Sequence, residues 1–367
     1  MILRNLTGTV CPKQAVFPPG AALRLNSAGA DDIMMPVPRE PRGSSGTISA
    51  VCAASPHGGT VYEIDYHADD YASSPENARR ILSLARAGKI DSFSVLTNMG
   101  CFEECMRLLR ESWDLFPKKP LLSVHLNLID GRWLSSGRGG TVIRQSWAGI
   151  LLRSLLPTRR QKMLSLFSAE IEAQIRAFLK ATADLKDDAG RPPELRIDSH
   201  VHTHMIPLVF RALLDTLERM QLTNRVRFIR CSAEPFFIFF RTPGVTGTVP
   251  LINLLKNIIL KVLSGPVRRR LRGLGIPTGY IFGVALTGEM DLKRVLLLRP
   301  GMSAYAQKKE MFLEVLSHPG RVLPEEVSEE YGPEDRKAFV SPMRDVEYRM
   351  LMELPRSGKD PESPVRE

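Results

Sequence analysis

The sequence has no long apolar run. Its longest candidate, residues 251–263, is interrupted by two asparagines and two lysines, whereas a transmembrane helix needs about 18 to 20 consecutive apolar residues. The N-terminal region lacks a charged stretch followed by an apolar one, which argues against a secretory signal. The five cysteines are irregularly spaced and odd in number, which favours reduced thiols over a disulfide framework. These absences predict a cytoplasmic protein without a membrane-spanning segment.

Acidic residues are too few to balance the basic ones. Lys and Arg total 50 and Asp and Glu total 40, so the formal net charge is +10, and residues 256–272 carry six cations and no acid. A solvated basic helix face is the simplest interpretation of this run, and an anionic substrate or a membrane surface would also fit it. Because no nucleic-acid motif accompanies the run, we do not expect a nucleic-acid partner.

Three regions can be distinguished along the 367 residues. Residues 1–59 are rich in Gly, Ala, Pro and Ser and lack periodicity, so we expect a poorly ordered leader. In residues 60–322, short β-rich runs alternate with helical ones, which indicates parallel βα units in an α/β barrel, closed or distorted. Residues 323–367 predict one helix near 334–353 and a frayed end.

The hydrophobic pattern predicts the individual elements. The expected strands are 60–66, 92–96, 121–126, 195–199, 226–230, 280–284 and 312–317. The expected helices are 75–88, 101–113, 160–180, 207–221, 251–263 and 303–311. The 160–180 helix is the clearest, because its apolar residues recur every three or four positions and form one stripe for the core.

Possible metal ligands cluster at the expected strand ends. They are Asp69 and Asp70 after the first strand, His125 at the end of the third, Asp198, His200, His202 and His204 after the fourth, and His318 after the last. The carboxyl ends of parallel barrel strands converge on one face, so these side chains could meet in one cleft. Carboxylates and imidazoles together are a ligand set for zinc or another divalent ion.

Each of these motifs also has a structural interpretation. The paired aspartates could cap a helix, His125 could be a satisfied core histidine, and the His-Pro-Gly at 318–320 could be a turn. The His-x-His-x-His run at 200–204 is more specific. On an extended segment its period-two spacing would put three imidazoles on one side, and burying them without a ligand is costly.

Four motifs, in this order, resemble the YdjC-like carbohydrate deacetylases, which include chitooligosaccharide deacetylases and hopanoid-associated relatives. The motifs are His67-Ala68-Asp69-Asp70-Tyr71, His125-Leu126-Asn127-Leu128, the run from Asp198 to Pro207, and His318-Pro319-Gly320. The resemblance extends from about Val61 to Gly320. The chain departs from the family's usual Asn-Ala-Asp-Asp-Phe-Gly at three positions, where it has His67, Tyr71 and Ala72. The resemblance therefore supports the family's fold and metal site for this chain more strongly than it supports a particular sugar substrate.

The resemblance implies a distorted (β/α) barrel related to the polysaccharide deacetylases. It also implies one divalent metal ion, Mg or Zn, held by Asp70, His125 and His200. Asp69 would be the general base and His318 the opposing general acid. This set suits the chemistry, because a metal can polarise an amide carbonyl and acidify a bound water toward pKa ~7, and an imidazole can protonate the leaving nitrogen.

Other polar side chains are expected around this site. Asp198 could orient a ligand histidine from behind, and His202 and His204 could line the pocket or support the metal. Arg230, at the end of the fifth expected strand, could bind an oxyanion or a substrate carboxylate, with Glu234 fixing it. A structural ion pair is an equally good interpretation of Arg230.

Aromatic and cysteine residues give weaker signals. Trp133 and Trp147, in the Gly-rich stretch 131–149, could stack on a sugar, and a packed aromatic in a loop is at least as good an interpretation. Cys101 and Cys105 share a helix face, but no further cysteine or histidine lies nearby in the sequence, so we do not expect them to bind a metal.

The sequence thus predicts a metal-dependent hydrolase that removes an N-acetyl group from an amino sugar or short oligosaccharide, with metal-bound water as the nucleophile. Two alternatives stay open: another metal hydrolase on the same barrel, such as a phosphoesterase or amidase, and a barrel that binds metal without catalysis. Asp69 discriminates against the last, because a structural site does not need a second, unligated carboxylate. The expected partner is a small carbohydrate, and a homodimer is compatible with the sequence.

Overall fold

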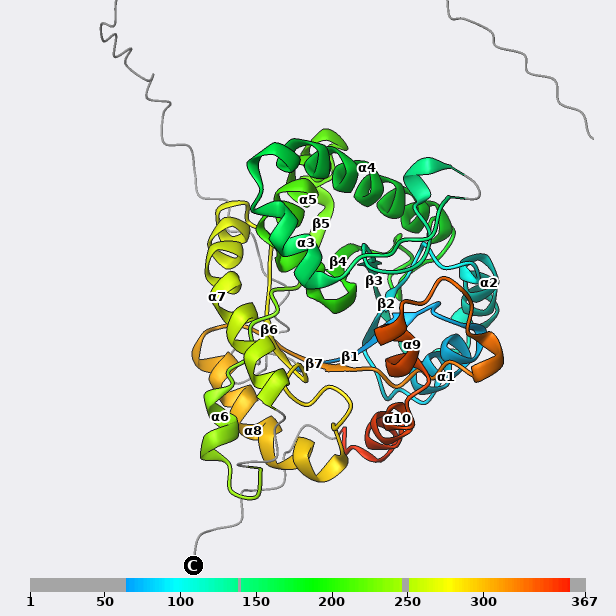
Figure 1. The fold of residues 1–367 in the computed structure, drawn as a ribbon. Helices are drawn as coiled ribbons and strands as arrows, with labels where there is room; N and C mark the ends of the chain where they lie inside the picture. The colour runs from blue at the N-terminus through cyan, green and yellow to red at the C-terminus, as the bar shows by residue number, and fades with distance from the viewer. Residues whose placement is uncertain (1–63, 138–139, 246–250, 357–367) are drawn as a thin grey trace, which may run out of the picture. The chain divides into compact units, whose positions relative to one another are not determined.

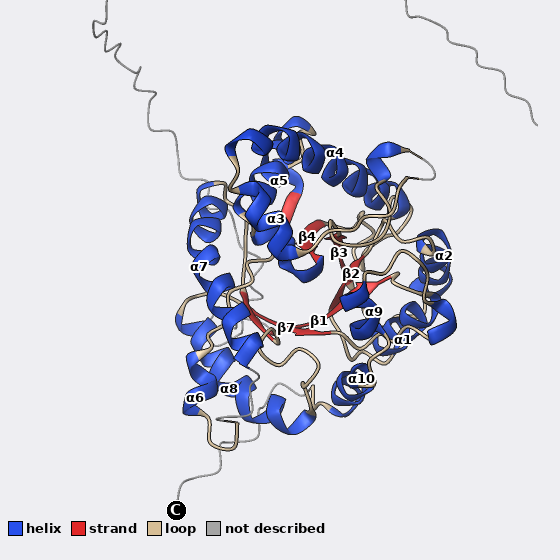
Figure 2. Ribbon diagram, in the orientation of Figure 1, coloured by secondary structure: helices blue, strands red, loops and turns tan. Residues whose placement is uncertain are grey.

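The computed structural model describes residues 64–137, 140–245 and 251–356. In this part of the chain the strands lie at the centre and helices surround them (Figures 1 and 2). The expected leader, residues 1–59, lies outside the described residues. Among the helices described, none has the length and apolar character needed to cross a membrane.

Parallel strands and helices alternate along most of the described chain. The strands are β1 (Ile64–Tyr71), β2 (Ser92–Val95), β3 (Leu121–Leu126), β4 (Leu195–Ser199), β5 (Val226–Ile229), β6 (Tyr280–Phe282) and β7 (Leu313–Ser317). The α-helices are α1 (Pro75–Arg86), α2 (Phe102–Trp113), α3 (Trp147–Ser154), α4 (Pro157–Ala181), α5 (Pro207–Arg219), α6 (Phe237–Arg241), α7 (Leu251–Gly273), α8 (Leu292–Lys308), α9 (Pro333–Phe339) and α10 (Met343–Glu353). Short 3₁₀ turns are η1 (Leu134–Ser136), η2 (His200–Met205), η3 (Thr223–Arg225) and η4 (Pro324–Glu326).

The seven strands form one curled parallel sheet in the order β5-β4-β3-β2-β1-β7-β6. The edge strands β5 and β6 do not pair as a ladder within the described residues. Two backbone hydrogen bonds nevertheless link these edges, from Ile281 N to Ala233 O (3.2 Å) and from Ile229 N to Pro277 O (3.3 Å). The fold is therefore a half-barrel or distorted barrel of the α/β class, which confirms the expected fold class.

The predicted amphipathic helix at 160–180, within α4, packs as expected. In α4 the stripe of Phe167, Ile171, Ile175 and Phe178 is buried in the main core, and Figure 1 shows α4 beside α5. Helix α1 begins after Ser74, whose side chain accepts a hydrogen bond from the Asn77 backbone N–H, a standard N-cap arrangement.

Several element boundaries were wrong, for identifiable reasons. Strand β1 continues to Tyr71, so the two aspartates lie within the strand and not after it. Helices α7 and α8 are longer than expected because they continue through Pro266 and Pro300, which normally signal a helix end. Helices α3 and α6 were not expected, and the tail contains α9 and α10 where one helix was predicted.

Candidate metal centre

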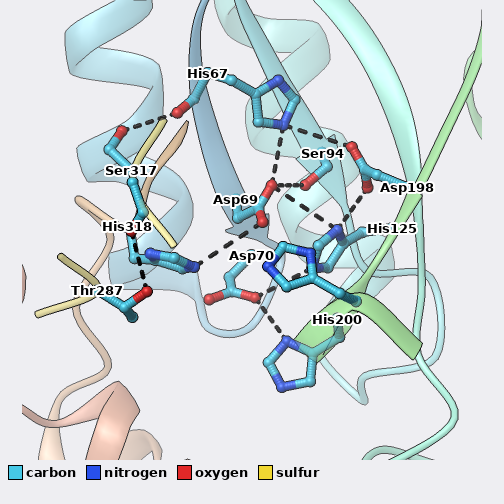
Figure 3. A network of polar contacts seen from close by, with 12 residues as sticks. His67, Asp69, Asp70, Ser94, His125, Asp198, His200, Thr287, Ser317 and His318 are labelled. Carbon is cyan, nitrogen blue, oxygen red and sulfur yellow. Dashed lines mark hydrogen bonds and ion pairs between the residues drawn. The ribbon is translucent and has the colours of Figure 1, made fainter. Parts of the chain in front are cut away.

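Three of the sequence-predicted residues converge at the carboxyl ends of the strands. Asp70, His125 and His200 offer ligand atoms that all lie within 4.8 Å of one another, and all three residues are buried. Asp70 Oδ1 lies 3.4 Å from His125 Nε2 and 3.0 Å from His200 Nδ1. Figure 3 shows both imidazoles directed at this one carboxylate.

An irregularity in β1 allows both adjacent aspartates to face the site. Consecutive side chains of a regular strand point to opposite faces, but the pairing of β1 with β2 shifts register between Ala68 and Tyr71. Asp70 and Ala72 also have φ values of 70° and 69°. Non-glycine residues in this left-handed region are strained, and such strain is concentrated at functional sites.

His125 is oriented by a carboxylate on the neighbouring strand. The parallel register of β3 and β4 places His125 beside Asp198, and its Nδ1 donates to Asp198 Oδ1 at 2.6 Å. The other ring nitrogen is thereby directed toward Asp70. This is the contact expected of Asp198, and metal-ligating histidines commonly have such a partner.

His200 has a corresponding carboxylate that the sequence analysis missed. Its Nε2 lies 3.3 Å from Asp335 Oδ1, and its ring stacks on Phe339 with centroids 5.8 Å apart. Both partners belong to α9. The tail contains many acids, and no local pattern distinguishes Asp335 from the others, so only the fold could reveal it.

The tail also contacts Asp70, the carboxylate of this cluster. Arg344 of α10 donates to Asp70 Oδ2 at 2.9 Å, which leaves Oδ1 facing the two imidazoles. A domain boundary at residue 322 would separate Asp335 and Arg344 from the residues they contact, so we propose that the functional unit includes α9 and α10.

Helix α9 is held in place by apolar and polar contacts. A small buried cluster joins it to the loop after β2, formed by Leu96, Met99, Val322, Tyr331 and Phe339. Asp130 accepts a hydrogen bond from the Gly332 backbone N–H at 2.8 Å. Burial and the neighbouring Asp335 carboxyl raise the pKa of Asp130 to about 8, whereas the His200 charge lowers that of Asp335 to about 2 despite its burial.

Asp69 belongs to a separate buried ion network. The Arg230 guanidinium donates to both of its oxygens, at 3.0 and 2.9 Å, and also contacts Asp198 at 3.2 Å and Glu314. Although burial opposes ionisation, the Arg230 charge holds the pKa of Asp69 well below its usual value. Asp69 is therefore a carboxylate at neutral pH.

This network decides between the interpretations of Arg230. The residue is only 1% exposed, so its donors are engaged by buried carboxylates and not directed at an open cleft. The expected pairing with Glu234 is wrong. Glu234 instead accepts hydrogen bonds from the Gly283 and Ala285 backbone N–H groups at 2.7 and 2.8 Å, and burial raises its pKa to about 7.

His318 lies beside Asp69. Because β7 pairs with β1, with Ala68 opposite Ser317, the two residues come from neighbouring strands although 249 positions separate them in the sequence. His318 Nε2 is 3.9 Å from Asp69 Oδ2 and its side chain is 19% exposed. The backbone N–H of His318 donates to Glu347 of α10.

The other two histidines of the 200–204 run do not join the cluster of Asp70, His125 and His200. The run is a 3₁₀ turn and not an extended segment, with Val201 and His202 at φ 50° and 56°. His204 hydrogen-bonds Ser199 Oγ and Arg230 O, and burial lowers its pKa to about 4, so it is a neutral structural residue. His202 Nδ1 instead lies 3.0 Å from Ser232 Oγ.

His67, one of the three departures from the family's usual motif, lies next to Asp69, the expected general base. His67 is fully buried, its Nδ1 lies 2.6 Å from Ser92 Oγ, and its Nε2 lies 3.0 Å from Asp69 Oδ1.

The side chain of Trp133 is partly buried and packs against the core. Its role in substrate binding stays a prediction. Within the described residues, no group that could hold a metal includes a cysteine.

The charges of this cluster suit a divalent cation. Despite their burial, nearby carboxylates raise the pKa of His125 to about 9 and that of His200 well above its usual value. The same carboxylates that favour a positive charge on these imidazoles would also favour a bound cation, which would compete with protons for the ring nitrogens. Two imidazoles and one carboxylate, each buried, fit such an ion.

The protein is thus an α/β protein with a curled parallel sheet and a cluster of carboxylates and histidines at the ends of its strands. The sequence profile described as YdjC-like protein matches residues 66–354, so the chain belongs to the YdjC-like family. Among solved structures, it is similar to a "putative cellobiose-phosphate cleavage protein" from Enterococcus faecalis V583. The similarity covers 79% of this chain and 93% of the other, at 17% identity and a TM-score of 0.48. No curated protein matches the sequence.

Exchanging Asp335 for Asn should weaken metal binding. The variant removes the negative charge behind His200 and should lower the affinity for zinc by about 10- to 100-fold, the usual effect of losing such a partner. Competition with a chromogenic chelator measures the zinc affinity of each variant. The control is Glu334→Gln, an exposed neighbour on the same helix. Equal affinities for both variants would show that Asp335 does not support the ligand.

Proposed function

We propose that this protein is a divalent-metal-dependent hydrolase that removes an N-acetyl group from an amino sugar or short oligosaccharide. The observation that carries the proposal is the meeting of Asp70, His125 and His200, with Asp69 and His318 adjacent. Membership of the YdjC-like family supports the carbohydrate class of the substrate. Two imidazoles suit zinc better than magnesium, which prefers oxygen ligands.

Asp70, His125 and His200 would hold the ion. When bound, it would supply Lewis-acid chemistry, polarising the amide carbonyl and making water a better nucleophile. Asp198 and Asp335 fix the two imidazoles from behind, and Arg344 occupies the outer oxygen of Asp70. These contacts keep the ligands in place before the substrate arrives.

Asp69 would take the proton from the attacking water. It is ionised and lies beside Asp70, which suits the position of a general base, although the Arg230 charge that keeps it ionised also weakens it as a base. Arg230 holds the carboxylate by two hydrogen bonds and so fixes its orientation. His318 would give a proton to the departing sugar nitrogen. Its partial exposure, compared with the buried ligands, makes it accessible to a substrate.

The alternatives have less support. A phosphoesterase would benefit from a cation in the cleft, but the guanidinium of Arg230 is buried and neutralised by three carboxylates. A barrel that binds metal without catalysis would not need Asp69 and His318 beside the ligands.

The test is an assay of acetate release from N-acetylglucosamine oligomers, with generic phosphoesters as competing substrates. We expect acetate release that is lost on chelation and restored by zinc. His318→Ala should lower kcat by about 10²- to 10⁴-fold, the range for acid–base groups, with unchanged metal content. Phosphoester cleavage without acetate release would overturn the proposal, and full activity of His318→Ala would remove the histidine from the mechanism.

A further inference from the structure

Helix α7 presents apolar side chains to solvent. Leu255, Ile258 and Val262 are 53%, 41% and 71% exposed, and their spacing of three and four residues places them on one face. The opposite face is buried and contains the apolar Leu260, Val267 and Leu271 beside the polar Asn257 and Ser264. Because this face already gives α7 the apolar side that a surface helix turns to the core, the exposed strip is additional to core packing.

Cations flank the strip. At about 100° per residue, Lys256 lies on one side of it and Lys261 on the other, and Arg269 and Arg270 extend the exposed face toward the end of the helix. Residues 251–273 contain no acid. Within the described ranges, no ion pair neutralises any of these four side chains.

Helix α6 continues this surface. Lys261 Nζ lies 4.4 Å from the centre of the Phe236 ring, and Phe236 makes an edge-to-face contact with Phe240, which is 54% exposed. Figure 1 shows α6 and α7 on the same side of the sheet, apart from α9 and α10. The α6–α7 surface is defined here as Phe240, Leu255, Ile258 and Val262 with Lys256 and Lys261.

We propose that the α6–α7 surface binds the headgroup region of an anionic lipid bilayer. The apolar side chains would enter the boundary between headgroups and acyl chains, while the flanking lysines reach back to lipid phosphates. Charge complementarity favours this occupant, because the surface contains cations without acids and the chain has a net charge of +10. The inference does not depend on the proposed catalytic function.

The test is sedimentation of the full chain with vesicles of phosphatidylcholine alone or mixed with phosphatidylglycerol. We expect binding to the mixed vesicles only, and its loss at high salt, which screens the lysine–phosphate attraction. The double variant Lys256→Glu/Lys261→Glu should weaken binding at least about tenfold, since each cation near an anionic surface contributes about 1 kcal/mol. Its control, Lys162→Glu/Lys180→Glu, changes exposed lysines of α4 and should retain clearly more binding.

A second pair of variants tests the apolar part. Leu255→Ser/Val262→Ser should also lose binding, whereas Leu115→Ser/Leu166→Ser, at 59% and 42% exposure elsewhere, should retain it. Because all these side chains are exposed, the variants should fold, and thermal melts verify it. Equal binding to neutral vesicles, no binding, or unchanged binding of both test variants would overturn the proposal. So would concentration-dependent self-association that Leu255→Ser/Val262→Ser abolishes, because a second copy would then cover the strip.

Discussion

Replacing Asp69 by Asn should leave the metal in place and lower kcat by at least about 10²-fold, as expected for loss of a general base. The substitution keeps the shape of the side chain and one acceptor oxygen for Arg230 and Ser94. It removes the basic oxygen that would accept the proton. Metal content by elemental analysis and kcat with a chitooligosaccharide substrate are the two measurements.

The matched variant is Asp70→Asn, one residue further along β1. It removes the negative charge between His125 and His200 and, if Asp70 holds the metal as proposed, should lose metal and activity together. The contrast between adjacent, chemically identical substitutions separates catalysis from metal binding. If Asp69→Asn also lost its metal, Asp69 would be a ligand and not the base; if it kept full activity, another group would accept the proton.

Arg230→Met should destabilise the fold by about 3–5 kcal/mol, the usual cost of removing one partner from a buried ion pair. The guanidinium contacts Asp69, Asp198 and Glu314 together, and all four groups are nearly inaccessible to solvent. Urea denaturation of the metal-free protein at neutral pH measures the loss.

The control is Arg227→Met on β5, three residues before Arg230, whose side chain is 59% exposed; it should change stability by no more than about 0.5 kcal/mol. The pH dependence provides a further check. The pKa values of Asp69 and Asp198 are lowered in the folded state, so their stabilisation is complete above the unfolded pKa of about 3.9 and is lost as pH falls below it. The difference between Arg230→Met and wild type should therefore narrow in acid. A difference under 1 kcal/mol at neutral pH would show that the network is not stabilised by this charge.

The sequence by itself determined the alternation of strands and helices and the side chains that end each strand. Both depend on local patterns: period-two and period-3.6 hydrophobicity identify the elements, and parallel strands bring their carboxyl ends to one edge. For that reason a cluster of carboxylates and imidazoles at this edge could be predicted without coordinates, and the resemblance to the YdjC-like family singled out Asp70, His125 and His200 within it.

Only the tertiary structure decided what surrounds those residues. The left-handed backbone at Asp70 and His202 could not be predicted from residue type, although aspartate and histidine adopt it more often than most other residues. The contacts of Arg230 with Asp69 and Glu314 and the approach of Asp335 and Arg344 join segments more than 80 residues apart. No periodic pattern records such contacts, because each depends on how elements from distant parts of the chain pack against the same strand ends.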